Sequence, residues 1–260
     1  MPSLLDRYGP WAIVTGASSG IGRAFAEALA DQGVSLVLVA RRESQLRQLA
    51  DALPVETRVV PADLGTTDGL AAVESQTSDL EVGLLVASAG FGTSGSLVEA
   101  QLDDEIAMLD VNMRAVLRHV HHFGNRMAER RRGGIVLLGS LVGFQGTPYA
   151  AHYAATKAYV QTLGEALHVE LKPRGVDVIV SAPGPVHTGF ADTADLQMGA
   201  AITPADVVGP TLAALGRRQT VRPGLLTKIL SAGLATVPRW GKVRIMERVM
   251  GGMTEHQRIA

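Results

Sequence analysis

Short apolar runs rich in β-branched residues alternate along the chain with longer segments whose apolar positions repeat at helical spacing. Six runs have the length and composition of buried strands: Trp11–Thr15, Ser35–Ala40, Thr57–Val60, Val82–Ala87, Ile135–Gly139 and Val176–Ser181. Helical patterns lie at Ile21–Asp31, Glu43–Leu53, Thr67–Thr77, Leu102–Arg131 and Tyr153–Lys172. This strict alternation predicts an α/β fold, a doubly wound parallel sheet with helices on both faces.

Ligands of such sheets bind at the carboxyl ends of the strands, where the strand order reverses. No internal repeat, low-complexity tract or proline- and serine-rich linker divides the 260 residues. We therefore expect a single domain over residues 1–220, followed by an extension of different composition over residues 221–260.

Composition and charge exclude several classes of function. Hydrophobic residues make up 47% and charged residues 19% of the chain, as in globular proteins. A net charge of −1 and 4% aromatic residues argue against a nucleic-acid partner. The chain has no cysteine, which excludes disulfides, cysteine-ligated zinc, iron–sulfur clusters and thiol nucleophiles. With neither a signal-peptide pattern nor a membrane-length apolar stretch, we expect a cytoplasmic protein.

The first predicted strand runs into a glycine-rich turn that opens the first predicted helix. A pyrophosphate held by N–H groups at a helix N-terminus requires a sharp turn with no Cβ in the way. Gly16 permits the turn, Gly20 lets the backbone approach, and Gly22 allows close packing. The turn predicts a dinucleotide site, although a purely structural turn is the alternative. Its candidate residues are Gly16, Ser18, Ser19, Gly20, Ile21 and Gly22.

The end of the second predicted strand carries Arg41 and Arg42. An acid at this place accepts a hydrogen bond from the ribose 2′-hydroxyl, whereas arginine accommodates a 2′-phosphate. The pair therefore predicts NADP(H) as the cofactor, and a solvated pair at a helix start is the alternative.

Tyr153 and Lys157 are four residues apart on a predicted helix and therefore share a face. A nearby cation is expected to lower the pKa of the phenol, so that it exchanges a proton with a substrate oxygen. Ser140 closes the fifth predicted strand, where the ligand of the sheet belongs. Asn112 lies inside a predicted helix, where asparagine has poor propensity.

In these features the chain resembles the short-chain dehydrogenase/reductase family over essentially its whole length. The matching elements are TGASSGIG at 15–22, Asp63-Leu64, Asn112, Ser140, Tyr153 with Lys157, and Pro183-Gly184 with Val186 and Thr188. The opening residues 5–11, with the arginine pair, resemble a subgroup that includes some bacterial hydroxysteroid dehydrogenases. The resemblance implies a Rossmann-like fold.

The resemblance also implies roles for single residues. Tyr153 is expected to be the catalytic acid/base, and Lys157 to lower its pKa and hold the nicotinamide ribose. Ser140 is expected to orient the substrate carbonyl, and Asn112 to support a water relay to Lys157. Further cofactor contacts are implied at Asp63, Leu64, Ala87, Gly90, Pro183, Gly184, Val186 and Thr188.

One position departs from the family pattern. Where the family usually has Asn-Asn-Ala-Gly after the fourth strand, this chain has Ala87-Ser88-Ala89-Gly90. The missing amide ordinarily braces the central sheet and borders the adenine ribose of the cofactor. We expect cofactor binding to survive, with Ser88 replacing part of the brace.

The substrate is expected to be hydrophobic. The segment 186–202 stands where the family carries its lid and is small, apolar and weakly charged. No Arg or Lys lies between Arg174 and Arg217, so no clamp for a phosphorylated or CoA-linked substrate is evident. We therefore expect the substrate to be a hydrophobic ketone or secondary alcohol, such as a steroid, a fatty-acyl-derived ketone or a xenobiotic. Candidate substrate contacts are Ser140, Val142, Phe144, His187 and Phe190, with His152 as a further candidate.

No metal site is predicted, because only His119 and His122 of the three histidines at 119–122 share a helix face. The stretch from Arg217 to Met250 carries eight Lys or Arg against one acid, Glu247, together with several leucines. This extension is expected either to gate the substrate or contact a second subunit, or to lie on anionic lipid. One short helix is expected between Pro223 and Pro238.

Together these patterns predict an NADP(H)-dependent oxidoreductase that interconverts a carbonyl and a secondary alcohol. A cofactor-binding sensor without turnover, and a related lyase or epimerase, are the alternatives. The resemblance implies a homodimer or homotetramer, associated through the long helices at Leu102–Arg131 and Tyr153–Lys172.

Overall fold

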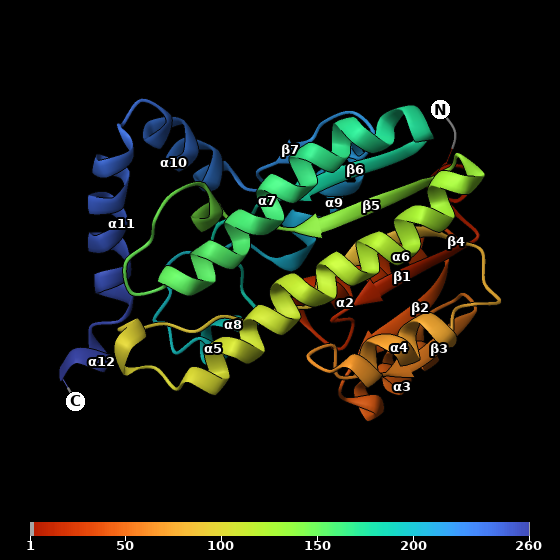
Figure 1. The fold of residues 1–260 in the computed structure, drawn as a ribbon, viewed down its shortest axis with the longest axis horizontal. Helices are drawn as coiled ribbons and strands as arrows, with labels where there is room; N and C mark the ends of the chain where they lie inside the picture. The colour runs from red at the N-terminus through yellow and green to blue at the C-terminus, as the bar shows by residue number, and fades with distance from the viewer. Residues whose placement is uncertain (1–2, 260) are drawn as a thin grey trace.

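This computed structural model describes residues 3–259, except for the side chains of Leu226, Leu230, Arg258 and Ile259. Within these residues the strands form one seven-stranded parallel sheet in the order β3-β2-β1-β4-β5-β6-β7 (Figure 1). The expected doubly wound Rossmann-like fold is confirmed. The strands are β1 (Trp11–Thr15), β2 (Ser35–Ala40), β3 (Thr57–Pro61), β4 (Val82–Ala87), β5 (Gly133–Leu138), β6 (Val176–Ser181) and β7 (Thr220–Val221).

Strand order reverses at β1, which pairs with β2 on one side and with β4 on the other. Thr15 at the end of β1 is in register with Ala87 at the end of β4. The chain leaves these two ends toward opposite faces of the sheet, so a crevice opens between them. The glycine-rich turn and the segment 88–90 border this crevice.

The helices cover both faces of the sheet, and each face has its own core. Alternate residues of the central strands face opposite ways, so β1, β2 and β4 are buried on both sides. One core packs the strands against α2 (Gly20–Ala30), α3 (Glu43–Ala52) and α9 (Pro204–Ala214). The other packs them against α4 (Thr67–Ser75), α6 (Ala115–Arg130) and α7 (Ala151–Leu171).

The long helix predicted at Leu102–Arg131 is not uniform. α5 (Leu102–Leu109) leads into a π-helical turn, Asp110–Arg114, and α6 continues from it. A π-helical turn holds an extra residue in the helix and often marks a functional site. Asn112 lies inside this turn.

Several short elements were not predicted: α1 (Leu4–Tyr8), α8 (Phe190–Thr193), α9, α12 (His256–Ile259) and the two-residue strand β7. The helix expected between Pro223 and Pro238 is present as α10 (Leu225–Ala235). It is followed by α11 (Arg239–Met253), which was also not predicted. The extension therefore adds helices to the domain after its last strand.

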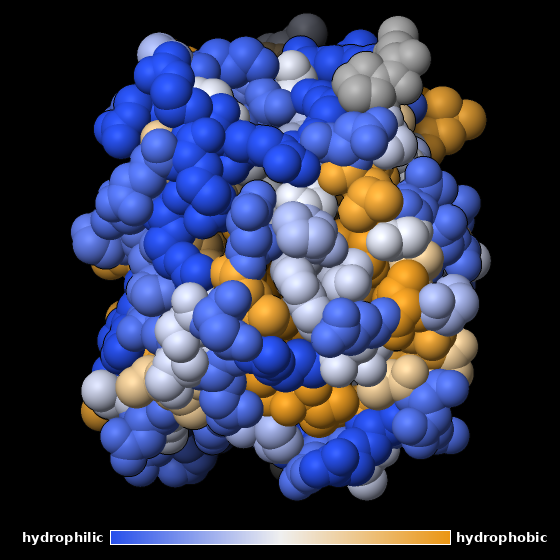
Figure 2. All heavy atoms as spheres, turned by 90° about the vertical axis from the view of Figure 1, so that its right-hand side faces the viewer, coloured by the Kyte–Doolittle hydropathy of each residue, from blue (hydrophilic) through white to orange (hydrophobic). Residues whose placement is uncertain are grey.

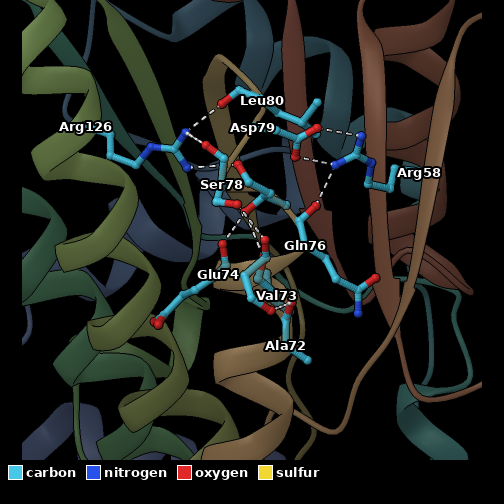
Figure 3. A network of polar contacts seen from close by, with 11 residues as sticks. Arg58, Ala72, Val73, Glu74, Gln76, Ser78, Asp79, Leu80 and Arg126 are labelled. Carbon is cyan, nitrogen blue, oxygen red and sulfur yellow. Dashed lines mark hydrogen bonds and ion pairs between the residues drawn. The ribbon is translucent and has the colours of Figure 1, made fainter.

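Two arginines hold the loop between α4 and β4 (Figure 3). Arg126 on α6 donates to the carbonyl oxygens of Thr77 and Leu80 at 3.0 and 2.6 Å. Arg58 on β3 pairs with Asp79 at 2.6 Å and donates to the Gln76 carbonyl at 2.7 Å. The two guanidinium groups approach the loop from opposite sides (Figure 3). Because the loop precedes β4, this network lies at the amino ends of the strands and serves the fold.

Hydrophilic side chains cover most of the end of the molecule at the amino ends of the strands (Figure 2). No helix within residues 3–259 is long and apolar enough to cross a membrane. Leu117 on α6 and Val169 on α7 are exposed apolar side chains. Association of two or four copies through these helices stays a prediction.

Gly164 on α7 and Gly124 on α6 are both buried on the same side of the sheet. Their replacement by alanine is expected to change the free energy of unfolding in opposite directions. A Cβ at Gly164 on α7 would overlap the Val180 side chain and lie 3.1 Å from Leu137, whereas one at Gly124 on α6 would lie 3.7 Å from Ile135. Gly164→Ala is expected to lower the free energy of unfolding by about 1–2 kcal/mol. Gly124→Ala is expected to raise it by about 0.5–1 kcal/mol through helix propensity. Thermal unfolding of both variants checks this pair, and a shift of the same sign in both would contradict it.

Candidate active site

A cavity of about 1020 Å³ opens at the carboxyl ends of the strands. Its floor is formed by the glycine-rich turn and by the ends of β2, β4 and β5, and its far wall by α10 and α11. Most predicted site residues line it: Gly16, Ser18, Ser19, Gly20, Ile21, Gly22, Arg41, Arg42, Asp63, Leu64, Gly90, Ser140, Val142, Tyr153, Lys157, Pro183, Gly184, Val186, Thr188 and Phe190. Asn112, Ala87, Phe144 and His187 lie outside this lining.

The glycine-rich turn has the geometry of a phosphate-binding cradle. Gly16 and Gly20 adopt positive φ angles of 68° and 56°, which glycine tolerates best. A Cβ at Gly16 would lie 3.0 Å from the Ala89 Cα, and one at Gly22 would overlap the Gly16 carbonyl. These two positions therefore leave no room for a side chain, and the turn at the start of α2 lines the cavity. The turn fits a dinucleotide pyrophosphate.

Arg42 lies beside this turn. Its Nη2 donates to the hydroxyl oxygens of Ser18 and Ser19, both at 3.2 Å. Arg41 lines the same region of the cavity. A guanidinium with two hydroxyls is a donor set suited to a phosphate group. Asp63 turns its Oδ1 to the Gly65 N–H at 2.9 Å, and this bond shapes the loop after β3.

Ser88 ties the ends of β1 and β4 together at the position where the family pattern is broken. Its hydroxyl donates to the Thr15 carbonyl, and its N–H donates to Thr15 Oγ1 at 3.1 Å. The Ala89 N–H donates to the same Oγ1 at 3.0 Å. Ala87 itself is buried in the core beneath the sheet. These bonds brace the strand ends without the usual amide.

Tyr153 and Lys157 project from the first turns of α7 into the cavity. Lys157 Nζ donates to the Leu138 carbonyl at 2.9 Å and lies 5.7 Å from the centre of the Tyr153 ring. Burial lowers the pKa of Lys157 to about 8, because the interior disfavours the ammonium. The two groups share a helix face, as the spacing predicted.

The expected lowering of the Tyr153 pKa is wrong for this structure. Burial raises the pKa of Tyr153 above its usual value, and the hydrogen bond with Ser140 opposes this rise only in part. The physical reason is desolvation: a phenolate loses more hydration here than the distant, carbonyl-bound ammonium returns. The Tyr153 hydroxyl is therefore protonated at neutral pH.

Asn112 lies behind Gly90, outside the cavity lining. Its Nδ2 donates to the Phe91 carbonyl at 2.8 Å and to Thr156 Oγ1 at 3.1 Å. Its Oδ1 accepts from the Phe91 N–H at 3.2 Å. A Cβ at Gly90 would come within 2.9 Å of this oxygen and 3.5 Å of Lys157 Nζ. Asn112 is thus close to Lys157, and its part in a water relay stays a prediction.

The loop after β6 carries the predicted contacts Pro183, Gly184, Val186 and Thr188, all in the cavity lining. The Gly184 N–H donates to Thr227 Oγ1 on α10 at 3.1 Å. Val186 forms an isolated bridge with Ile202, which closes the lid segment on itself. The extension thus holds the loop in place.

The predicted substrate contacts divide into two groups. Ser140, Val142 and Phe190 line the cavity, and the Phe190 ring lies 5.2 Å from that of Tyr153. Phe144 instead lies under the Arg222 guanidinium at 4.3 Å. His187 lines a second, smaller hollow, which shares Thr188, Leu196 and Met198 with the main cavity.

His152 does not line the cavity, because its Nδ1 is 2.6 Å from Glu105 Oε2. This pair joins α7 to α5 one residue before Tyr153.

The apolar wall opposite Tyr153 was not predicted residue by residue. It consists of Phe91, Leu196 and Met198, and of Leu234, Ile245, Met246, Val249, Met250 and Met253 from α10 and α11. The signal available in the sequence was the alternation of apolar and basic residues in the extension, which indicates a helix with one apolar face.

The buried lysine predicts a particular pH dependence of stability. Between the folded pKa of about 8 and the ordinary value of 10.5, the unfolded chain binds a proton that the folded chain has released. The burial of Lys157 therefore lowers the free energy of unfolding at neutral pH, and this cost disappears as the pH rises through the window. Lys157→Met is expected to be more stable than the unaltered protein at pH 7, and this difference is expected to shrink by about 2 kcal/mol at pH 10. Denaturant unfolding at both pH values measures it, and an equal difference at the two would contradict the burial of a charged lysine.

The family model described as short chain dehydrogenase matches residues 10–198. A 7beta-hydroxysteroid dehydrogenase of Clostridium sardiniense is 33% identical over 231 residues, which cover 86% of this chain and 88% of that protein. A solved 7beta-hydroxysteroid dehydrogenase structure matches with a TM-score of 0.87 at 28% identity and covers 94% of this chain and 99% of its own. A short-chain dehydrogenase from Sphingobium yanoikuyae, solved in complex with NADPH, matches at 0.78 and 30% identity, covering 89% and 97%.

Proposed function

The chain belongs to the short-chain dehydrogenase/reductase family, and from this premise we propose that it is an NADP(H)-dependent carbonyl reductase and alcohol dehydrogenase for hydrophobic small molecules. One observation carries the proposal: a single cavity joins a glycine-rich turn flanked by arginines, a buried Tyr153–Lys157 pair and an apolar wall. The turn suits a dinucleotide, the pair suits proton exchange with a substrate oxygen, and the wall suits an apolar substrate.

The choice of NADP(H) is supported by the donors around the turn. Arg41, Arg42, Ser18 and Ser19 meet where the adenosine end of a dinucleotide lies in this fold. No acid from the end of β2 stands in their place. A structural relative, the Sphingobium yanoikuyae enzyme, was solved in complex with NADPH.

When bound, the cofactor supplies or accepts the hydride. The residues of the chain bind the cofactor, orient the substrate and exchange a proton with it. Tyr153 carries a proton on its hydroxyl at neutral pH and lines the cavity, where it would give that proton to a carbonyl oxygen during reduction. Burial raises the pKa of Tyr153 and so makes it a weaker acid in this structure, which a bound cofactor and substrate would have to offset. The Ser140 hydroxyl, hydrogen-bonded to Tyr153, would orient that oxygen. Lys157 would stabilise the phenolate that remains.

The apolar wall of the cavity supports a hydrophobic substrate. Three methionines of α11 (Met246, Met250 and Met253) and the neighbouring aliphatic side chains offer a flexible, uncharged surface. No Arg or Lys of the described lid or tail lines the cavity. A bulky, uncharged ketone or secondary alcohol fits this surface, and a steroid is a natural candidate because two relatives are 7beta-hydroxysteroid dehydrogenases.

Turnover tests the proposal directly. We expect the protein to oxidise NADPH in the presence of a hydrophobic ketone, followed by the loss of NADPH absorbance across a panel of steroid and non-steroid ketones. Tyr153→Phe is expected to lower kcat by about 100-fold or more, because it removes the proton donor. NADPH binding, followed by its fluorescence, is expected to persist in this variant. NADPH binding without turnover of any ketone would instead favour a cofactor sensor.

Arg42 predicts the cofactor preference. Arg42→Ala is expected to raise the KM for NADPH by about 10- to 100-fold, since a charged hydrogen bond to phosphate contributes about 1.5–3 kcal/mol. The KM for NADH is expected to change little. Arg47→Ala serves as the control, because Arg47 pairs with Glu43 on the outer surface of α3. An equal effect of Arg42→Ala on both cofactors would contradict the assignment.

A further inference from the structure

Helices α10 and α11 present apolar side chains to solvent. We call Leu225, Ile229, Trp240, Ile245 and Val249 the tail surface. Leu225 and Trp240 are each 74% exposed, Ile229 is 59% exposed, and Ile245 and Val249 are 39% and 44% exposed. Exposed apolar residues scattered singly are ordinary, but a group of them on two neighbouring helices indicates an interaction site.

Cations lie on the same helices as the tail surface. Lys228, Arg239, Arg244 and Arg248 are exposed on the same two helices. Glu247 is the only acid between Arg222 and Met250, and it pairs with Arg244 at 2.8 Å. The surface therefore combines apolar side chains with a net positive charge, although the chain as a whole carries −1.

The tail surface is continuous with the cavity. Ile229, Ile245 and Val249 are exposed and also line the cavity, so they stand at its mouth. α11 forms the outermost layer of the molecule on the side toward which the strands point (Figure 1). Apolar lining residues thus extend from the exposed side chains of α10 and α11 to the Tyr153 ring.

We propose that the tail surface docks on an anionic lipid bilayer and opens the cavity toward it. The proposal rests on the proposed function, in that a hydrophobic substrate would reach Tyr153 from the bilayer. Lysine and arginine are attracted by anionic headgroups, and tryptophan favours the interface between headgroups and acyl chains. The helices are short and would lie in the plane of the interface.

Charge favours a bilayer over a second copy of the chain as the occupant. In a two-fold interface the same patch meets itself, so a tail surface with net positive charge would face another with net positive charge. Like charges at an interface disfavour association, and only Glu247 is present to offset them. An anionic bilayer has the complementary charge over the whole surface.

Vesicle flotation tests the proposal on the full-length protein. The probes are vesicles of phosphatidylcholine alone and of equal parts phosphatidylcholine and phosphatidylglycerol, at low and high salt. We expect flotation with the anionic vesicles at low salt, and weaker flotation at high salt, because salt screens exposed charges. Lys228→Glu is expected to lower the bound-to-free ratio by about fivefold or more, and Trp240→Glu by about tenfold or more.

Two variants serve as matched controls. Trp240→Phe keeps an apolar ring and is expected to float nearly as well as the unaltered protein. Arg174→Glu reverses an exposed charge beside the start of β6, at the opposite end of the molecule, and is expected to float normally. Neither Lys228 nor Trp240 lines the cavity, so their variants are expected to turn over a water-soluble ketone at the normal rate.

Flotation and turnover are scored separately. Tyr153→Phe is expected to float normally, so loss of the reaction leaves the docking result intact, and the reverse also holds. No recovery with anionic vesicles at low salt would overturn the proposal. Equal flotation of Trp240→Glu and the unaltered protein would overturn it as well. So would an increase in gel-filtration elution volume on Trp240→Glu without lipid, since the tail surface would then lie between two copies.

Discussion

The arrangement of the site depends on the hydrogen bonds of one buried side-chain amide, that of Asn112. It binds both backbone groups of Phe91 and the hydroxyl of Thr156, and so joins the segment after β4 to α7. Thr156 donates in turn to the Tyr153 carbonyl, one turn before it on the helix. A buried amide without these partners would cost about 1–3 kcal/mol for each group left unpaired. The π-helical turn carries Asn112, and the amide thereby ties the segment after β4 to the helix that bears Tyr153 and Lys157.

The cavity combines two environments that meet at Tyr153. Toward α2 and β2 it offers backbone N–H groups, hydroxyls and guanidinium groups; toward α10 and α11 it offers sulfur and hydrocarbon. Lys157 lies where the two environments meet, and its ammonium donates a hydrogen bond to the Leu138 carbonyl. Burial acts on both partners of the pair, lowering the pKa of the lysine and raising that of the tyrosine. The burial that the apolar wall and the lid provide thus also favours the neutral phenol.

The strands and the cofactor-facing turn were predictable, because burial on both faces demands continuous β-branched runs and a close approach demands glycine. Val82–Ala87 and the turn at 16–22 have the predicted extent. The π-helical turn was not predictable, since apolar spacing does not distinguish one extra residue in a helix. α9 does carry a start signal, the capping box of Thr203 and Asp206. The directions of Phe144 and His187, and the raised pKa of Tyr153, depend on Arg222, the lid and α11, whose places no local pattern reveals.

The order of the chain separates the two environments of the cavity. The sheet, the glycine-rich turn and the Tyr153–Lys157 pair are complete by β7, whereas α10 and α11 follow it and supply much of the apolar wall. Substitutions in these last helices reshape what the cavity accepts without entering the strands or the turn. Natural selection, or a protein engineer, can therefore change the shape of the apolar wall at the end of the gene while the glycine-rich turn and the Tyr153–Lys157 pair keep their sequence.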